Sequence, residues 1–422
     1  LRKIDSVIDF SFIHDLCAPL YCADNGRPAI DPEILFRMLF VGYLYGIRSE
    51  VRLCEEIQDN TAYRWFCGLG LTEKVPDHAT ISVNRKRRFR NNDIAEQIFQ
   101  EILNQAQEKG LVGGKILYTD STHVKALANK HKKVTIEVTR TPKTYIRELD
   151  AAVAEERKKL GKKEFDDKND PPTTGTIQQS KSDPDSGQLH KEGKPDGFHY
   201  SEHRTVDSRH NIIVNTYITP ANINDTDAIP VILQQIQKRL GKLPFYMGLD
   251  AGYHNAAVAH QLAENGIQAV LGYRRHTYPH GTYGKYRFRY DPALDCYICP
   301  EGRQLKHTTT SREGYRQYCC DTETCQSCPK RGECFGASSK RKVVTRHVWQ
   351  DDLDHSDAFT KSPAGKSRYA WRKQTIELSF ADAKQLHGFR YARMRGNANM
   401  REQAFLTAAV QNMKKMASLL WK

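Results

Sequence analysis

The sequence predicts an α/β protein in which an all-helical N-terminal domain precedes a mixed-sheet core, with a small cysteine-rich module inserted. Three observations lead to this prediction. Residues 1–110 carry apolar side chains at helical spacing, whereas residues 115–272 alternate short strand-like runs with helical segments. Seven of the 11 cysteines fall between Cys296 and Cys334, which marks a separate module.

Length, charge and cysteine content narrow the class of protein. At about 150 residues per domain, 422 residues suggest two to three units. A net charge of +14 favours a polyanionic partner, nucleic acid or an anionic membrane surface. No apolar run reaches the roughly 18 residues of a membrane-spanning helix, and no signal-peptide core follows the first residues. Because 11 cysteines is an odd number in a chain that does not need disulfides, we expect a reducing cytoplasm, with the protein at the nucleoid and not at a membrane.

The N-terminal domain, residues 1–110, begins with clear helix signals. Asp31 and Pro32 are a helix cap and a first helical residue, and the segment from Ile94 to Gly110 carries a regular apolar face. A basic run follows the middle of this domain and contains Arg85, Arg87 and Arg88. Two interpretations have similar weight: a solvated basic face, or a helix that contacts DNA phosphates.

Residues 111–272 are expected to form the first part of the sheet core. A turn at 207–210 joins two strand-like runs and predicts a hairpin. Residues 161–197 are polar and nearly free of large apolar side chains, so we expect a flexible insertion there. The other predicted elements are a helix at 147–160, strands at 115–119, 245–249 and 269–272, and helices at 228–240 and 256–265.

Three carboxylates stand out by their positions. Asp120 and Asp250 each follow a predicted strand, and the carboxyl ends of strands are where α/β sheets place ligand groups. Glu377 lies on a helix predicted at 368–384, on one face with Lys373 and Lys384, which suits a metal ligand beside phosphate-binding cations. Taken singly, an aspartate at such a position is more commonly a turn or helix-capping residue, and a helical glutamate beside lysines is more commonly part of an ordinary ion pair.

Residues 273–350 form the second unusual segment. The pattern Cys296-x2-Cys299, Cys319-Cys320 and Cys325-x2-Cys328-x5-Cys334 is typical of a structural zinc site, with free buried thiols as the alternative. Before it, aromatic residues alternate with cations, among them Arg274 and Arg275. This alternation suits stacking on unpaired bases and phosphate contact, or else an edge hairpin with a basic outer face.

Several motifs along the chain belong together. They are Asp-Pro-Glu-Ile-Leu-Phe-Arg-Met-Leu-Phe (31–40), Asp-His-Ala-Thr-Ile-Ser (77–82), Tyr-Thr-Asp-Ser-Thr-His-Val-Lys-Ala (118–126), Ser-Asp-Pro-Asp-Ser-Gly (182–187), Thr-Pro-Ala-Asn-Ile-Asn-Asp (219–225), Asp-Ala-Gly-Tyr (250–253) and the set Tyr369, Arg372, Glu377 and Lys384. Together they resemble bacterial insertion-sequence transposases of the DDE type. The similarity is to the branch with a helical N-terminal transposase domain and a cysteine-rich insertion before the glutamate, and it covers essentially the whole chain.

The resemblance implies a ribonuclease-H-like core and Mg²⁺-dependent cleavage and strand transfer of DNA. Asp120, Asp250 and Glu377 would be the three acidic residues, which hold two Mg²⁺ ions, or Mn²⁺ in their place. Water first cuts the DNA to free a 3′-OH, which then attacks target DNA, so no covalent protein–DNA intermediate is needed. The implied partners are double-stranded transposon ends, target DNA and further copies of the chain in a synaptic complex.

In the C-terminal part, residues 351–422, the resemblance assigns DNA contacts to Tyr369, Arg372 or Lys373, and Lys384. The family has three residues between its arginine and glutamate; here Arg372 leaves four and Lys373 leaves three, so both remain candidates. Residues 361–422 form a basic tail with a net charge of +10. By the same resemblance the zinc ligands are Cys299, Cys325, Cys328 and Cys334, with Cys296 as the alternative to Cys299. Two other functions stay open: a non-catalytic DNA-binding protein derived from a transposase, and a metal-dependent nuclease without strand transfer.

Overall fold

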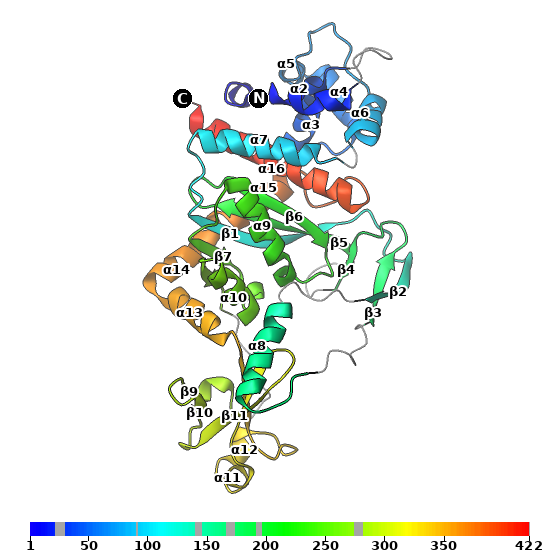
Figure 1. The fold of residues 1–422 in the computed structure, drawn as a ribbon. Coiled ribbons are helices and arrows are strands. Elements are labelled where there is room, and N and C mark those ends of the chain that lie inside the picture. Colours follow the sequence, from blue (N-terminus) through cyan, green and yellow to red (C-terminus); the bar gives the residue numbers. More distant parts are fainter. Residues whose placement is uncertain are drawn as a thin grey trace.

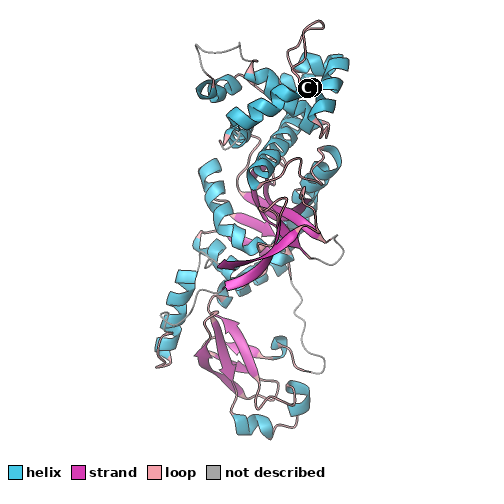
Figure 2. Ribbon diagram, turned by 90° about the vertical axis from the view of Figure 1, so that its right-hand side faces the viewer, coloured by secondary structure: helices cyan, strands magenta, loops and turns pink. Residues whose placement is uncertain are grey.

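The computed structural model describes residues 1–21, 30–89, 92–139, 146–165, 174–190, 196–273 and 282–421. The chain is elongated, with a helical N-terminal part at one end, a mixed sheet in the middle and the cysteine-rich module at the other end (Figures 1 and 2). The predicted class, mixed α/β with a helical N-terminal region, is therefore confirmed.

The N-terminal part consists of short helices around an apolar centre. As expected from the sequence, Asp31 caps α3 by accepting the Glu33 amide at 2.7 Å, and Pro32 is the first helical residue. The elements are α1 (Arg2–Asp5), α2 (Phe12–Cys17), η1 (Ala18–Leu20), α3 (Pro32–Leu44), α4 (Glu50–Asp59), α5 (Thr61–Phe66), α6 (His78–Asn84), the π-helical turn η2 (Arg85–Phe89) and α7 (Ile94–Glu108).

The central sheet has eight strands in the order β2-β3-β4-β5-β1-β7-β8, with β6 also paired to β5. The predicted hairpin is confirmed, because β5 and β6 pair antiparallel on either side of the turn at 208–212. Strands β1, β7 and β8 run parallel to one another. The bounds are β1 (Ile116–Lys125), β2 (Lys133–Thr139), β3 (Thr174–Ser180), β4 (Gly187–Leu189), β5 (Gly197–Asp207), β6 (Ile213–Pro220), β7 (Tyr246–Leu249) and β8 (Gln268–Leu271).

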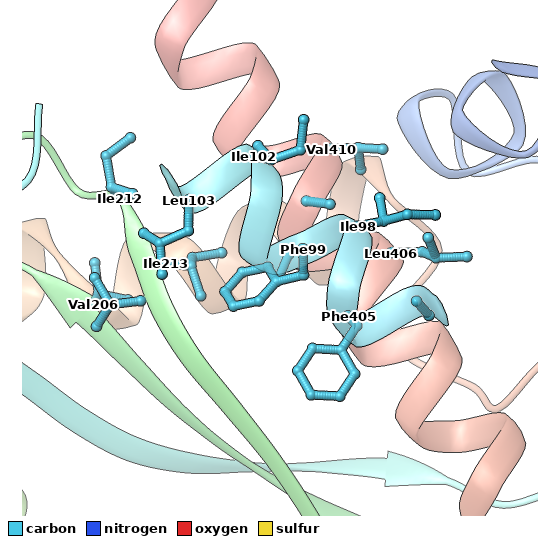
Figure 3. Packing of buried hydrophobic residues seen from close by; sticks show 14 of the residues in the cluster. Ile98, Phe99, Ile102, Leu103, Val206, Ile212, Ile213, Phe405, Leu406 and Val410 are labelled. Atoms are coloured by element: carbon cyan, nitrogen blue, oxygen red, sulfur yellow. The ribbon is translucent and has the colours of Figure 1, made fainter. Parts of the chain in front are cut away.

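The long C-terminal helix α16 (Asn397–Leu420) joins the N-terminal helices to the sheet. It lies between α7 and β6, and the rings of Phe99 and Phe405 are 5.6 Å apart (Figure 3). Ile213 of β6 belongs to the same buried cluster as the side chains of both helices. The helical part and the sheet therefore share one hydrophobic core, which stabilises their relative position.

The segment expected to be a flexible insertion differs from that expectation in its described residues. β3 pairs with β2 through seven residue pairs, β4 pairs with β5, and β5 itself begins at Gly197. Asp183 is buried and accepts hydrogen bonds from the Tyr200 hydroxyl at 2.7 Å and the Gly396 amide at 3.1 Å. A strand ladder satisfies backbone groups whatever the side chains are, so low apolar content did not prevent these strands. Residues 166–173 and 191–195 lie outside the described part.

Two further elements differ from the sequence prediction. β1 continues to Lys125, so Asp120 lies in the middle of a strand and not at its end. The helix predicted at 368–384 is interrupted: α14 (Pro363–Ala370) and α15 (Ile376–Leu386) are separated by the 3₁₀ turn η7 (Trp371–Gln374). Thr375 between them has φ −116° and ψ −91°, which is not helical, so Lys373 and Glu377 do not share a helix face.

The remaining helices and the cysteine-rich module complete the chain. The module is a five-stranded antiparallel sheet in the order β13-β12-β11-β10-β9, with its own small apolar cluster. None of the helices in the described ranges has the length and apolarity needed to cross a membrane. The other elements are α8 (Ile146–Lys159), η4 (Asp225–Ala228), α9 (Ile229–Leu240), η5 (Ala251–Tyr253), α10 (Ala256–Glu264), η6 (Lys285–Arg287), β9 (Arg289–Asp291), β10 (Cys296–Ile298), β11 (Gln304–Thr310), β12 (Tyr315–Cys319), α11 (Thr322–Gln326), α12 (Arg331–Cys334), β13 (Val343–His347) and α13 (Gln350–Lys361).

Candidate active site

Asp120 and Asp250 lie on neighbouring parallel strands. The register of β1 and β7 pairs Tyr118 with Gly248, so two residues further along each strand Asp120 comes beside Asp250. Asp250 follows the last residue of β7 and accepts the Gly252 amide at 2.9 Å, which fixes its side chain at the start of η5. The structure therefore brings the two aspartates to adjacent positions on neighbouring strands.

The environment of Asp120 disfavours its negative charge. Burial raises the pKa of this carboxyl to about 6, and the nearby negative charge of Asp250 acts in the same direction. The cation of Arg372 and the Ser121 amide, which donates to Asp120 Oδ1 at 2.7 Å, oppose the shift without cancelling it. A pair of neighbouring, partly exposed carboxylates of this kind is stabilised by any cation that both can share.

Arg372 connects the third predicted carboxylate to this pair. Its Nη2 donates to Asp120 Oδ2 at 2.7 Å, and its Nη1 lies 3.9 Å from Glu377 Oε1. The guanidinium is buried, whereas the Glu377 side chain is 49% exposed and the neighbouring Lys373 is also exposed. Of the two candidate cations, the structure thus brings Arg372 to the carboxylates, because η7 turns Lys373 away.

Tyr369 and Lys384 contact residues in or next to this group. Arg372 Nη1 is 3.5 Å from the Tyr369 hydroxyl, and that hydroxyl approaches Gly272 so closely that a Cβ there would lie 2.4 Å from it. Lys384 donates from Nζ to the Thr122 hydroxyl, and burial lowers the pKa of its ammonium. Lys384 therefore points into the sheet region and not freely into solvent.

Two residues near the aspartates were not among the predicted site residues. The charge of Asp225, at the start of η4, raises the pKa values of both Asp120 and Tyr253, so it lies close to them. Tyr253 is fully buried, and burial raises the pKa of its hydroxyl well above the ordinary value. The position of Asp225, a few residues after the end of β6, was the sequence signal that could have identified it.

The predicted basic residues of the N-terminal part have different surroundings. Arg85 forms ion pairs with Glu50 and with Glu402, the latter at 2.9 Å, and its side chain is 11% exposed. Arg88 hydrogen-bonds Asn84 and lies over the ring of Tyr21, whereas Arg87 is exposed. The other two predicted DNA-binding arginines, Arg274 and Arg275, lie outside the described residues.

The four cysteines chosen as zinc ligands lie around one small cavity. Cys299, Cys325, Cys328 and Cys334 all line it, together with Cys320, which the prediction did not include. Burial, together with the neighbouring Cys325 and Cys299, raises the pKa of the Cys320 thiol to about 11. Cys296 is buried in β10 and does not line the cavity.

The described residues contain no set of three or more His, Cys, Asp or Glu side chains arranged to hold a metal ion. The donor types nevertheless fit the expected ions. Carboxylate oxygens suit Mg²⁺ at Asp120, Asp250 and Glu377, and thiolates suit Zn²⁺ in the cysteine cavity.

Comparisons with known proteins identify two regions of the chain. Residues 1–87 match the family "Transposase domain (DUF772)", and residues 298–417 match the family "Transposase DDE domain". No curated protein sequence matches the chain.

Among solved structures, a piggyBac transposase synaptic complex with hairpin DNA is 9% identical, with a TM-score of 0.38 over 99% of this chain and 73% of that one. A Mos1 transposase paired-end complex with the left transposon end is 9% identical, with a TM-score of 0.18 over 59% of this chain and 62% of that one. A pre-cleavage Mos1 transpososome is also 9% identical, with a TM-score of 0.17 over 59% and 61% of the two chains.

Proposed function

We propose that this chain, a transposase with a DUF772 N-terminal domain and a DDE domain, moves an insertion sequence by Mg²⁺-dependent DNA cleavage and strand transfer. As a DDE transposase it is a polynucleotidyl transferase. Both steps are in-line displacements at phosphorus, so one site serves for both. The observation that carries the proposal is the meeting of Asp120 and Asp250 on adjacent strands, with Glu377 joined to them through Arg372.

The strand arrangement supports a ribonuclease-H-like core. Strands β6, β5 and β1 are antiparallel neighbours, and β7 and β8 extend the sheet in parallel on the other side of β1. The two aspartates come from the two strands at the centre of that arrangement. This is the position that the resemblance to DDE transposases implies.

Asp120, Asp250 and Glu377 would hold the divalent metal. Bound Mg²⁺ would activate the attacking oxygen and stabilise the leaving oxygen. Asp120 and Asp250 supply negative charge at one place, and burial first and the charge of Asp250 second raise the pKa of Asp120. Arg372 holds Asp120 and approaches Glu377, so it orients both carboxylates and brings a positive charge that a DNA phosphate can share.

Double-stranded DNA, as transposon ends and as target, is the proposed partner. The exposed cations Arg87 and Lys373 are available for phosphate contact, whereas Arg85 is largely occupied by Glu50 and Glu402. Assembly of several copies in a synaptic complex completes the proposal. It follows from the chemistry, since two transposon ends must be handled together.

For the cysteine-rich module we propose one structural Zn²⁺ bound by Cys299, Cys325, Cys328 and Cys334. Their shared cavity supports this assignment, and it favours Cys299 over Cys296. Zinc bound there would hold the loop after β10 to α11 and α12, whose residues already share the small apolar cluster of the module.

A paired assay with transposon-end DNA tests the proposed function. The wild-type protein should cut the ends in Mg²⁺ and join the freed 3′-OH to a target plasmid, and Asp120→Asn should do neither. Cutting without joining would identify a nuclease, and binding without cutting would identify a non-catalytic DNA-binding protein. Either result would overturn the proposal.

A further inference from the structure

A fully buried ion pair lies within β5, outside the carboxylate group described above. Arg204 donates from Nε and Nη2 to Glu202 Oε1 at 2.9 and 2.8 Å, and neither side chain is exposed to solvent. Thr216 of β6 donates a further hydrogen bond to the same carboxylate oxygen at 2.9 Å. The pair is thus completely enclosed in the core and well supplied with hydrogen bonds.

The pair lies on the same side of the sheet as Asp120. In the antiparallel register of β1 and β5, Asp120 is opposite Arg204 and Thr122 is opposite Glu202. Residues directly opposite each other project to the same face. Asp120, the proposed catalytic aspartate, is therefore the direct cross-strand neighbour of the buried Arg204.

From that position Arg204 reaches the helix that carries Glu377. Its Nη1 donates to the backbone oxygen of Ser379 at 3.1 Å and to the Ser379 hydroxyl at 2.8 Å, two residues beyond Glu377. The same nitrogen donates to Gln411 Oε1 of α16 at 2.8 Å, and Gln411 in turn donates to the Ser379 backbone oxygen at 3.0 Å. One guanidinium therefore binds β5, α15 and α16 together.

The energetics of such a pair favour a role in positioning. The cost of removing both charges from water roughly offsets their attraction, so a buried ion pair adds little net stability. Its hydrogen bonds are directional, however, and a shift of α15 would leave buried donors without partners. The apolar contacts of Ile376 and Phe380 on the same helix do not fix its rotation or its register in this way.

We propose that Glu202 and Arg204 are positioning residues that fix α15 against β1 and β5 and so hold Glu377 at Asp120. Neither residue touches substrate; both act through the helix. The catalytic consequence rests on the proposed function, whereas the positional claim concerns the fold alone. The chain also offers a matched control, because Arg239 is another buried arginine, which pairs with Glu96 and links α9 to α7 away from the carboxylates.

The experiment compares Glu202→Gln/Arg204→Met with Glu96→Gln/Arg239→Met in the full-length protein. Hydrogen exchange of α15 amides, Mn²⁺ affinity by electron paramagnetic resonance, DNA affinity and the single-turnover cleavage rate are measured below the melting temperature. In the first variant we expect exchange in α15 to rise about tenfold or more and Mn²⁺ affinity to fall. The cleavage rate should fall about 10²-fold, the order of loss that a displacement of about 1 Å produces, with DNA affinity within about twofold.

The control variant should exchange faster in α7 and α9 and keep Mn²⁺ affinity and cleavage within about twofold of the wild type. A folded Glu202→Gln/Arg204→Met protein with unchanged α15 exchange and Mn²⁺ affinity would overturn the proposal. Equal losses in both variants would overturn it as well, because they would indicate general destabilisation.

A second variant covers the case in which the double change prevents folding. Gln411→Met leaves Glu202 and Arg204 in place but removes the link from α16 to Arg204 and Ser379. It should loosen α15 and lower Mn²⁺ affinity by several-fold, and wild-type values for both would overturn the proposal. If the wild type does not cleave DNA while the exchange and Mn²⁺ results follow these expectations, the proposed function fails and the positioning role is supported.

Discussion

Arg372 Nη2 and Asp120 Oδ2 are 2.7 Å apart, although 252 residues separate them in the sequence. The contact ties the middle strand of the sheet to the turn that precedes α15. Because the same guanidinium also approaches Glu377 at 3.9 Å, one buried cation is shared by two of the three predicted carboxylates. A change at Arg372 therefore affects both, whereas a change at the exposed Lys373 affects neither directly.

The first prediction concerns Asp120. Asp120→Asn keeps the shape of the side chain and removes one metal-binding charge, so cleavage and strand transfer should be abolished. DNA-end binding should stay near normal or tighten slightly, since one negative charge facing the DNA is lost. The measurements are a gel shift and a Mg²⁺-dependent cleavage assay. Asp59→Asn, at the exposed end of α4, is the control and should cut normally. Residual cutting by Asp120→Asn would refute the catalytic assignment.

The second prediction separates Arg372 from Lys373. Arg372→Gln removes a charge that holds Asp120 and should lower the cleavage rate by about 10² to 10³, the usual cost of losing a preorganised charge at a reacting group. Lys373→Gln should leave the cleavage rate nearly unchanged. It should make the slope of log DNA affinity against log salt concentration shallower by about 0.9, which corresponds to one phosphate contact. Rates and binding at two salt concentrations are measured for both. The reverse result would show that Lys373 faces the carboxylates in the DNA complex.

Local signals made part of this fold predictable. The start of α3 follows from Asp31 and Pro32, and the β5–β6 hairpin follows from the polar turn at 207–210. The sequence also marked Asp120 and Asp250 as residues that follow short apolar runs, and the structure brings them to neighbouring parallel strands, although Asp120 lies inside β1.

Other features depend on contacts between distant segments. Nothing local marks Thr375 as the residue where the helix breaks, so the spacing placed Lys373 on one helix face with Glu377 and Lys384, whereas only the latter two lie on α15. The buried position of Arg204 depends on α15 and α16, which follow it by more than 170 residues. From composition alone, an arginine in a strand is expected to be exposed. Arg204 is buried because residues distant in the sequence supply its hydrogen-bond partners.

The third prediction distinguishes two arginines of the basic run. Arg85→Ala should lower the free energy of unfolding by about 2 kcal/mol or more, since it leaves the largely buried Glu50 and Glu402 without their common partner. Arg87→Ala should leave thermal unfolding unchanged and weaken DNA binding, with a smaller salt slope. Thermal melts and gel shifts at two salt concentrations test both. If Arg87→Ala binds DNA with unchanged affinity and salt slope, this run is only a solvated surface.

The fourth prediction concerns the pH dependence of stability. His387 is buried at the end of α15, its Nδ1 lies 2.9 Å from the Tyr43 carbonyl oxygen of α3, and burial lowers its pKa from 6.5 to about 4. The unfolded chain thus binds a proton that the folded chain does not, so stability is complete above pH 6.5 and is lost as the pH falls towards 4. The contribution of this one group is about 3 kcal/mol.

His387→Gln keeps a donor for the Tyr43 carbonyl and removes the titration. The variant should therefore show a shallower loss of stability between pH 6.5 and 4, in urea unfolding measured at several pH values. His203 and His347 are also buried with lowered pKa values, so the wild-type slope should decrease in part and not vanish. If the variant loses stability with falling pH as steeply as the wild type, protonation of His387 does not destabilise the folded protein and the prediction is wrong.

The last prediction concerns the cysteine-rich module. Protein purified without chelator should contain about one zinc per chain by elemental analysis, with Zn–S distances near 2.3 Å by X-ray absorption. Cys325→Ser changes a residue that lines the shared cavity and should lose the zinc and destabilise the module. Cys296→Ser is the matched control, since Cys296 is buried outside that cavity and should keep the metal. Because Cys320 also lines the cavity, Cys299→Ser and Cys320→Ser compared side by side identify which of the two is the fourth ligand. Zinc-free, stably folded wild-type protein would refute the site, because five clustered thiols would then be held by packing alone.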